Sequence, residues 1–184
     1  MLIYVIHDKK VLCINNAFEN IKVLEWFKNS GYEFKYNEDA IEYASKNGYV
    51  EVLEWFKNSG YKFKYDERII MYASENGHIQ VLEWFKNSGY EFKYNNRAIN
   101  KASENGHIQV LEWFKNSGYE FKYDECAIGC ALYFGHIHIL KFLINMNVKK
   151  FITVLEYDDF IKTIKIKKTL KYLKGYQKNF NFFI

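Results

Sequence analysis

Val81-Leu82-Glu83-Trp84-Phe85-Lys86-Asn87-Ser88-Gly89-Tyr90 is one of four copies of the same decapeptide in this chain. The other copies begin at Val23, Val52 and Val110, so consecutive copies start 29 residues apart, and an altered fifth copy begins at Ile139. A repeat of roughly 20 to 50 residues is typical of a solenoid, in which one repeat cannot bury its apolar face alone and stacks on its neighbours. The decapeptide therefore predicts stacked repeats rather than one closed core.

Alignment on this decapeptide divides the chain into repeats and two ends. Residues 1–36 are predicted to form an N-terminal capping repeat, in which Glu19-Asn20 replaces the Gly-His pair of later copies, and four repeats follow at 37–65, 66–94, 95–123 and 124–152. Residues 153–184 are predicted to form a basic helical C-terminal cap, in which residues 170–176 look like a decayed sixth copy. Ends that differ from the middle are typical of such arrays, because a terminal repeat has a neighbour on one side only.

Each repeat is predicted to contain two short helices, which makes the fold all-α. In the copy at 66–94, Asp66 is a good N-cap. Ile69, Ile70 and Ala73 then fall on one apolar face, and Gly77 ends the first helix. The second helix carries Val81, Leu82, Trp84 and Phe85 inward. Helices of about ten residues are not stable alone in water, so we expect the neighbouring copy to shield the Trp and Phe rings from solvent.

A segment that alternates aromatic and charged residues follows each second helix. Gly89 to Tyr94 reads Gly-Tyr-Glu-Phe-Lys-Tyr, and period 2 indicates a half-buried extended segment. Repetition predicts ladders of equivalent rings, namely Tyr61, Tyr90 and Tyr119, and Phe63, Phe92 and Phe121. Two interpretations stay open here: these rings form the edge of the core, or they form an aromatic docking strip.

The order of helix, Gly-His turn, helix, Gly and extended link resembles an ankyrin repeat. The segment Ala73-Ser74-Glu75-Asn76-Gly77-His78-Ile79-Gln80-Val81-Leu82-Glu83-Trp84-Phe85, followed by Gly89, is similar to the family pattern Ala-Ala-x-x-Gly-His-x-x-x-Val-x-x-Leu-Leu-x-x-x-Gly. The family's Thr-Pro-Leu-His is replaced, for example by Arg68-Ile69-Ile70-Met71, and each repeat is four residues shorter than the usual 33, with the loss in the β-finger between Gly60 and Arg68. The array looks like the short ankyrin repeats of giant DNA viruses of amoebae.

This resemblance implies an ankyrin-type solenoid of helix–turn–helix repeats with a shortened β-finger and helical caps. It also implies a protein-binding scaffold without catalysis, located inside a cell, in the host cytoplasm or in the virion if the chain is viral. We expect no signal peptide, because the opening Met-Leu-Ile-Tyr-Val-Ile-His is short and lacks a basic start, and no membrane span, because no apolar stretch is long enough.

Charge is distributed unevenly along the 184 residues. The net charge is +4, but residues 149–184 hold nine Lys and three acidic residues, a net charge of +6, so residues 1–148 carry −2. A basic tail is compatible with binding to nucleic acid or an anionic membrane surface, and equally with a helix whose Lys face is solvated. The Glu and Lys that flank each Trp-Phe, such as Glu54 and Lys57, are expected to form an exposed pair on one helix.

Histidines and cysteines offer little support for a metal site. His78, His107 and His136 recur at repeat spacing, and stacked helices about 8–10 Å apart cannot bring equivalent residues to one ion. A role of each Gly-His in its turn is therefore expected. Cys126 and Cys130 with His136 and His138 form the one mixed Cys/His cluster of the sequence, but the Cys positions correspond to Arg97 and Lys101 one repeat earlier. We predict no metal and no cofactor.

The differences between copies indicate where a partner binds. Residues 73–94 and 102–123 are identical, whereas the preceding seven residues differ at five positions. The variable positions have offsets 0, 3, 4 and 7 along the first helix, opposite its apolar side. The predicted partner-binding residues are Asp39, Glu42, Tyr43, Lys46, Arg68, Met71, Tyr72, Glu75, Arg97, Asn100, Lys101 and Glu104. The alternative is a solvated face where substitutions are tolerated, but Tyr and Arg are enriched among residues that dominate binding, which favours Tyr43, Arg68, Tyr72 and Arg97 as anchors.

The predicted function is that of a non-enzymatic scaffold or adaptor, which acts as a monomer and has no small-molecule substrate. Its predicted partner is a protein, and a host protein if the chain is viral. The alternative is binding to nucleic acid or an anionic surface through the Lys-rich tail, with Lys162, Lys165, Lys167, Lys168, Lys171 and Lys174. Steep weakening by salt distinguishes the second mode from the first.

Overall fold

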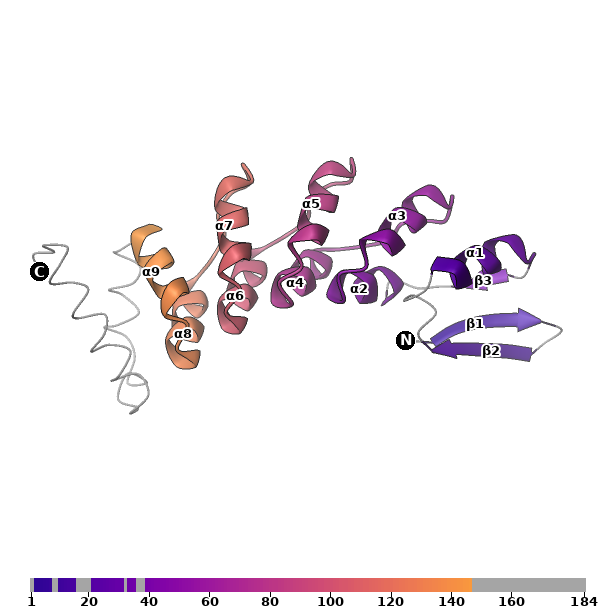
Figure 1. Cartoon of the computed structure of the whole chain (residues 1–184), viewed down its shortest axis with the longest axis horizontal. Helices are drawn as coiled ribbons and strands as arrows, with labels where there is room; N and C mark the ends of the chain where they lie inside the picture. Colours follow the sequence, from indigo (N-terminus) through magenta and orange to yellow (C-terminus); the bar gives the residue numbers. More distant parts are fainter. Residues whose placement is uncertain (1, 8–9, 16–20, 32, 36–38, 147–184) are drawn as a thin grey trace, which may run out of the picture. The chain divides into compact units, whose positions relative to one another are not determined.

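The computed structural model describes residues 2–7, 10–15, 21–31, 33–35 and 39–146 (Figure 1). Its backbone divides into two compact units, residues 1–98 and 99–184, with the division inside helix α6 (Asn96–Asn105). Each unit is considered by itself. The predicted C-terminal cap at 153–184 and the last residues of the 124–152 repeat lie outside the described residues.

Short helices make up every described element between residues 39 and 146. The first unit contains α1 (Ile21–Asn29), α2 (Asp39–Lys46), α3 (Val50–Asn58), α4 (Arg68–Glu75) and α5 (Ile79–Asn87). The second contains most of α6 together with α7 (Ile108–Asn116), α8 (Glu125–Phe134) and α9 (Ile137–Met146). The helices α3, α5, α7 and α9 each begin 29 residues after the one before, so the period of the sequence is also the period of these helices.

Local chemistry sets where these helices begin and end. The backbone N–H of Arg68 donates to Asp66 Oδ1 at 2.9 Å, and that of Cys126 donates to Asp124 Oδ1 at the same distance, so an Asp side chain satisfies an unpaired donor of the first turn. Gly77 and Gly135 follow first helices with φ of 73° and 76°, in the left-handed region that favours glycine. The predicted turn glycine Gly77 is thus confirmed, and Asp66 accepts from the first turn as a cap does, although the N-cap position of α4 is Glu67.

The core is built from one face of each helix, and successive repeats share it. In the first unit α2 packs on α3 and on α4, and α3 packs on α5; in the second, α9 packs on α8 and α7. The Phe of each decapeptide is buried, with exposed fractions of 1% or less at Phe27, Phe56, Phe85 and Phe114. Burial of an aromatic side chain removes about 150–250 Å² from water, which offsets the weakness of such short helices.

The tryptophans follow the prediction less closely than the phenylalanines do. Trp55 and Trp113 are buried and Trp84 is half-buried, but the ring of Trp26 is 55% exposed. The prediction that every Trp ring is shielded is therefore wrong for Trp26. Trp26 belongs to the first copy of the decapeptide in the sequence.

A small antiparallel sheet at the N-terminal end was not predicted. Strand β1 (Leu2–His7) pairs with β2 (Lys10–Asn15) and with β3 (Glu33–Lys35), in the order β2-β1-β3. The predicted all-α class holds for the repeats at 39–146, but the expectation of a helical N-terminal cap is wrong for these residues, because strands accompany α1. Within the described segments, no helix reaches the length and apolarity that crossing a bilayer requires.

Candidate functional site

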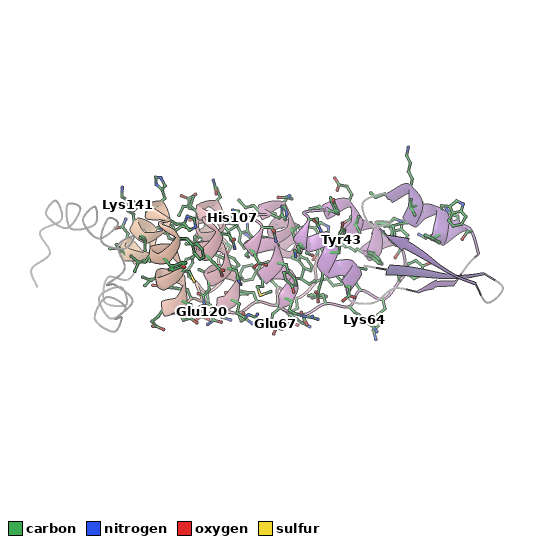
Figure 2. All side chains as sticks on the ribbon, turned by 90° about the horizontal axis from the view of Figure 1, so that it is seen from below. Tyr43, Lys64, Glu67, His107, Glu120 and Lys141 are labelled. Atoms are coloured by element: carbon green, nitrogen blue, oxygen red, sulfur yellow. The ribbon has the colours of Figure 1, made fainter. Side chains whose placement is uncertain are left out.

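A shallow, open hollow of about 310 Å³ lies between α2 and α4, the first helices of two repeats in the first unit. It is lined by Asp39, Glu42, Tyr43, Lys46 and Tyr72, all five of which belong to the predicted partner-binding face. The α2 residues recur at offsets 0, 3, 4 and 7, so they lie along one stripe of the helix. Tyr72 occupies in α4 the position that Tyr43 occupies in α2 (Figure 2 labels Tyr43). The sequence pattern therefore located the residues of a concave surface.

Two half-buried tyrosine rings and a lysine shape this hollow. Lys46 is exposed, and its Nζ lies 5.8 Å from the centroid of the Tyr72 ring, within range of a cation–π interaction. The Tyr43 ring lies 6.2 Å from that of Tyr49 at an angle of 52°. Rings, a carboxylate and an ammonium along one stripe provide apolar contact, hydrogen bonding and charge in a small area, as protein interfaces do.

The residues at offset 3 were predicted to be open to a partner, but two of them are engaged in contacts within the chain and the third is buried. Glu42 pairs with Arg68 Nη1 at 2.8 Å, and its side chain is only 15% exposed. Asn100 Nδ2 donates to Asp124 Oδ1 at 2.7 Å in the second unit. Met71, at the same offset, is 6% exposed, so the prediction that it contacts a partner is wrong for the folded chain. For Glu42 and Asn100, this position thus contacts a residue of the next repeat, Arg68 and Asp124 respectively.

The other predicted residues remain at the surface to different degrees. Asp39, Lys46 and Arg97 are exposed, whereas Arg68 is 41% exposed and binds Asp66 through Nε at 2.9 Å in addition to Glu42. The half-exposed members are Tyr43, Tyr72, Glu75, Asn100, Lys101 and Glu104. Lys101 and Glu104 form an ion pair of 2.8 Å along α6. Arg68 is thus held in the structure by two carboxylates, which makes Arg97 the more accessible of the two arginines.

A contact between repeats that the sequence reasoning missed involves the Glu-Trp pair of the decapeptide. Trp55 Nε1 donates to Glu25 Oε1 at 2.6 Å, and Trp84 Nε1 donates to Glu54 Oε2 at 2.7 Å. Each indole thus binds the glutamate of the preceding copy. The hydrogen bond from Trp84 is the main cause that lowers the pKa of Glu54, followed by one from Asn58.

Pairing with Lys57, which was predicted for Glu54, is therefore not the main contact of this glutamate. Its two oxygens accept from Trp84 and Asn58, and Lys57 contributes a weaker electrostatic effect on its pKa. The signal for this contact was present in the sequence. Glu and Trp are adjacent in each of the four decapeptides, and a pair that spans two repeats has a separation of 30 residues, one more than the period.

The Gly-His pairs also connect successive repeats. His136 Nε2 lies 2.9 Å from the carbonyl oxygen of Glu104, one repeat earlier, and its ring packs against Gly106. In the first unit, His78 packs in the same way against Gly48. The backbone N–H of His78 and of His136 also closes its own turn, with bonds to Ala73 and Ala131 of 2.8 Å. The predicted role in the turn is confirmed, and a contact with the preceding repeat is added to it.

The cysteines lie in α8, where Cys126 is exposed and Cys130 is half-buried. Burial is the first cause that raises the pKa of both thiols, and nearby carboxylates, Asp124 for Cys126 and Glu104 for Cys130, raise it further. A raised pKa reduces the thiolate that both nucleophilic attack and metal binding need. Nowhere in the described segments do three or more His, Cys, Asp or Glu side chains gather as a metal site.

The extended links bring their rings together across repeats. Phe63 stacks on Tyr90 with centroids 4.5 Å apart and on Trp84 at 5.7 Å, and Tyr65 Oη donates to the carbonyl of Glu91 at 2.8 Å. The predicted ladder is thus diagonal, because a Phe meets the Tyr and Trp of the next copy. Rings that are half-buried against each other favour the interpretation as a core edge.

Comparison with known proteins identifies the repeat type for part of the chain. A protein-family model described as ankyrin repeats (3 copies) matches residues 70–154. That range covers most of the predicted repeats at 66–94, 95–123 and 124–152. No curated protein matches the chain. Ankyrin-type repeats of helices are therefore confirmed over this range, and such repeats are generally modules for protein–protein interaction. The resemblance to proteins of giant viruses stays a prediction.

Proposed function

We propose that this chain is a non-enzymatic scaffold or adaptor that binds a protein partner through the exposed residues of its first helices. The observation that carries the proposal is the hollow between α2 and α4, since the positions that line it are among those that change most between otherwise constant copies. Residues that only maintain the fold are expected to stay constant, as the Phe of each decapeptide does. The partner is a host protein if the chain is viral.

Among the predicted binding residues, we propose those whose side chains a partner can reach. Asp39, Tyr43, Lys46 and Tyr72 line the hollow in the first unit, and exposed Arg97 lies on the same side of its own helix by offset. We leave Met71 out because it is buried, and we assign Glu42 and Asn100 to contacts between repeats. Two Tyr and one Arg are residue types that dominate interface energetics.

The test is an affinity capture with the full chain as bait, in an extract of the cells that make it, with variants on and off the proposed face. Lys46→Glu and Tyr43→Ala change the hollow, whereas Lys64→Glu reverses a charge at an exposed position of an extended link. We expect the captured partner to decrease about tenfold or more with the first two variants and to stay at the wild-type level with Lys64→Glu. A partner captured equally by all three contradicts the proposal.

The same capture separates the alternative function. Binding to nucleic acid or an anionic surface through the Lys-rich residues at 162–174 is predicted to weaken steeply with salt and to be insensitive to Tyr43→Ala. Binding that is lost with Tyr43→Ala and changes little between low and moderate salt supports the first-helix face.

A further inference from the structure

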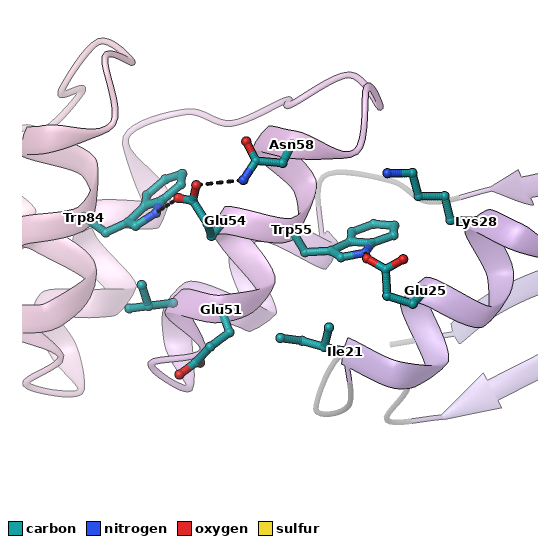
Figure 3. A pocket seen from close by; sticks show the side chains of 9 residues that line it. Ile21, Glu25, Lys28, Glu51, Glu54, Trp55, Asn58 and Trp84 are labelled. Atoms are coloured by element: carbon teal, nitrogen blue, oxygen red, sulfur yellow. Dashed lines mark hydrogen bonds between the residues drawn. The ribbon is translucent and has the colours of Figure 1, made fainter.

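A second and larger hollow lies on the second helices of the first unit. It has a volume of 530 Å³, and its lining includes the rings of Trp55 and Trp84 and the charged groups of Glu25, Glu51, Glu54 and Lys28 (Figure 3). These side chains come from α1, α3 and α5. None of them belongs to the first-helix face, so the hollow is a separate surface whose role is independent of the function proposed above.

Hydrogen bonds hold its aromatic and acidic groups in place. Trp55 donates to Glu25 and Trp84 donates to Glu54, so each ring has its orientation fixed by a carboxylate (Figure 3 shows the Trp84–Glu54–Asn58 chain). The lowered pKa of Glu54 means that its carboxylate is charged at neutral pH. Trp84 is half-buried, and part of its surface therefore remains accessible. Little rearrangement is needed before a ligand contacts these groups, which favours binding.

The charges of the hollow favour a cation. Its lining has three carboxylates against one ammonium, a net charge of −2. Trp is the best aromatic partner for a cation placed over its ring. The chain itself provides an example, because Lys57 Nζ lies 6.0 Å from the centroid of the Trp84 ring.

The next repeat supplies a natural comparison. A hollow of 320 Å³, shifted by one repeat, is lined by Glu54, Lys57, Glu83 and Trp84 in equivalent positions, but Gln80 stands where the larger hollow has Glu51. It therefore has two carboxylates against one ammonium. Glu51 is exposed at the start of α3, so the exchange alters charge without altering the core. The two hollows therefore differ in one carboxylate, in a second tryptophan and in volume, and only a substitution at Glu51 separates the carboxylate from the other two differences.

We propose that the hollow lined by Trp55, Trp84, Glu25, Glu51 and Glu54 binds an arginine side chain presented by a partner protein. A guanidinium is planar, so it can lie against an indole ring and at the same time donate two parallel hydrogen bonds to a carboxylate. A lysine ammonium lacks both the plane and the paired donors. Glu51 is the carboxylate that distinguishes this site from its neighbour, and it sets the preference for this hollow.

The experiment titrates N-acetyl-arginine amide into the full chain and follows the indole ¹H–¹⁵N resonances of the four tryptophans. The neutral ligand N-acetyl-citrulline amide has nearly the same shape and is the matched control. We expect saturable shifts of the Trp84 and Trp55 indoles with the arginine ligand and none with citrulline. Trp26 is exposed but lines neither hollow, so its indole reports non-specific association and is expected to stay in place.

Variants then test the assigned carboxylate. Glu51→Gln gives this position the residue type that its neighbour has at Gln80, and we expect it to weaken arginine binding about two- to fivefold, as the loss of one surface ion pair does. Glu120→Gln removes the same charge from an exposed position of a link in the second unit, outside the lining of the hollow, and is expected to leave binding unchanged. Gln80→Glu is expected to strengthen the response of Trp84.

Several results overturn the proposal. These are the absence of any indole shift with arginine, equal shifts with arginine and citrulline, a Trp26 shift as large as that of Trp84, and Glu51→Gln binding that equals wild type. Each of them leaves the first-helix proposal untouched, because the two surfaces share no residue.

Discussion

Replacement of Gly106 by Ala tests how strongly adjacent repeats are joined through the Gly-His pair. Gly106 has φ of +82°, and a Cβ atom placed there would lie 2.8 Å from Cε1 and 2.9 Å from Nδ1 of His136 in the next repeat. Those distances are well inside van der Waals contact. Gly118 provides the matched control, because its φ is +86° but no atom lies within 4 Å of an added Cβ. The two positions share backbone strain and differ in the clash.

The expected magnitudes follow from these two terms. Alanine in the left-handed region costs about 1 kcal/mol at either position. The clash with His136 adds about 1–3 kcal/mol, the range found for overpacked sites. His136 cannot withdraw without disturbing the contact of its Nε2 with the Glu104 carbonyl, at 2.9 Å. We therefore expect a loss of stability of about 1 kcal/mol for Gly118→Ala and about 2–4 kcal/mol for Gly106→Ala.

Urea unfolding followed by tryptophan fluorescence measures both losses, and the background variant His136→Ala identifies their cause. Removal of the imidazole makes room for the methyl group, so the difference between Gly106→Ala and Gly118→Ala is expected to disappear in that background. Gly48 and Gly60 give a related comparison in the first unit, where only Gly48 would clash, with Gln80 Nε2 at 2.7 Å and with His78 Nδ1 at 2.8 Å. Equal losses for the two glycine variants, or a difference that persists with His136→Ala, would refute this account of the Gly-His pair.

Four further predictions concern the decapeptide and the thiol of Cys126. A double-mutant cycle of Trp84→Phe and Glu54→Gln is expected to give a coupling of about 1 kcal/mol, since a hydrogen bond to a charged group contributes more than that only when it is well buried. The pKa of Glu54 is lowered in the folded state, so the stability that its carboxylate contributes is present above the ordinary pKa of glutamate and is lost as the pH falls through the folded pKa. In thermal unfolding between pH 3 and pH 6, Glu54→Gln is therefore expected to lose less stability on acidification than the wild type does. Calorimetry of Phe85→Ala should show a loss of about 3–5 kcal/mol, against less than about 1 kcal/mol for exposed Trp26→Ala. Iodoacetamide at neutral pH is expected to label Cys126 more slowly than it labels cysteine in solution, as followed by mass spectrometry, because the pKa of that thiol is raised.

The sequence predicted the helices well because their periodicity is strong and repeated. Ile69, Ile70 and Ala73 are buried as the apolar pattern required, and the turn at Gly77 has the expected left-handed backbone. The strands at 2–7 and 10–15 were missed because no second copy of that segment exists for comparison. A pattern that is present once gives a far weaker signal than one present four times.

The candidate site was predicted less completely, for a physical reason. Helical periodicity separates the inner from the outer side of a single helix, but it does not show which outer residues meet the neighbouring helix. Met71 and Glu42 therefore counted as surface residues, although one is buried and the other is paired with Arg68. The hydrogen bond of Trp84 to Glu54 was missed in the same way, because it joins two copies that the pattern treats separately.

The recurrent residues of these repeats thus join one repeat to the next, whereas we infer that exposed variable residues form the surface offered to a partner. Two pairs that recur in most copies, Glu-Trp and Gly-His, both reach from one repeat to the next, and the buried Phe fills the core beneath them. They are not invariant, since Tyr49 follows Gly48 and Lys141-Phe142 replaces Glu-Trp in the fifth copy. The contacts of these pairs do not involve Asp39 or Arg97, so we expect a change at either exposed position to leave them intact. Variation at offset 3 is different, since Glu42 pairs with Arg68 and Asn100 donates to Asp124, each in the next repeat. The choice of neighbouring repeat is therefore constrained at offset 3 and at the position that it meets, which for Glu42 is Arg68 at offset 0, whereas we expect exposed residues such as Asp39, Lys46 and Arg97 to be open to change in the surface offered to a partner.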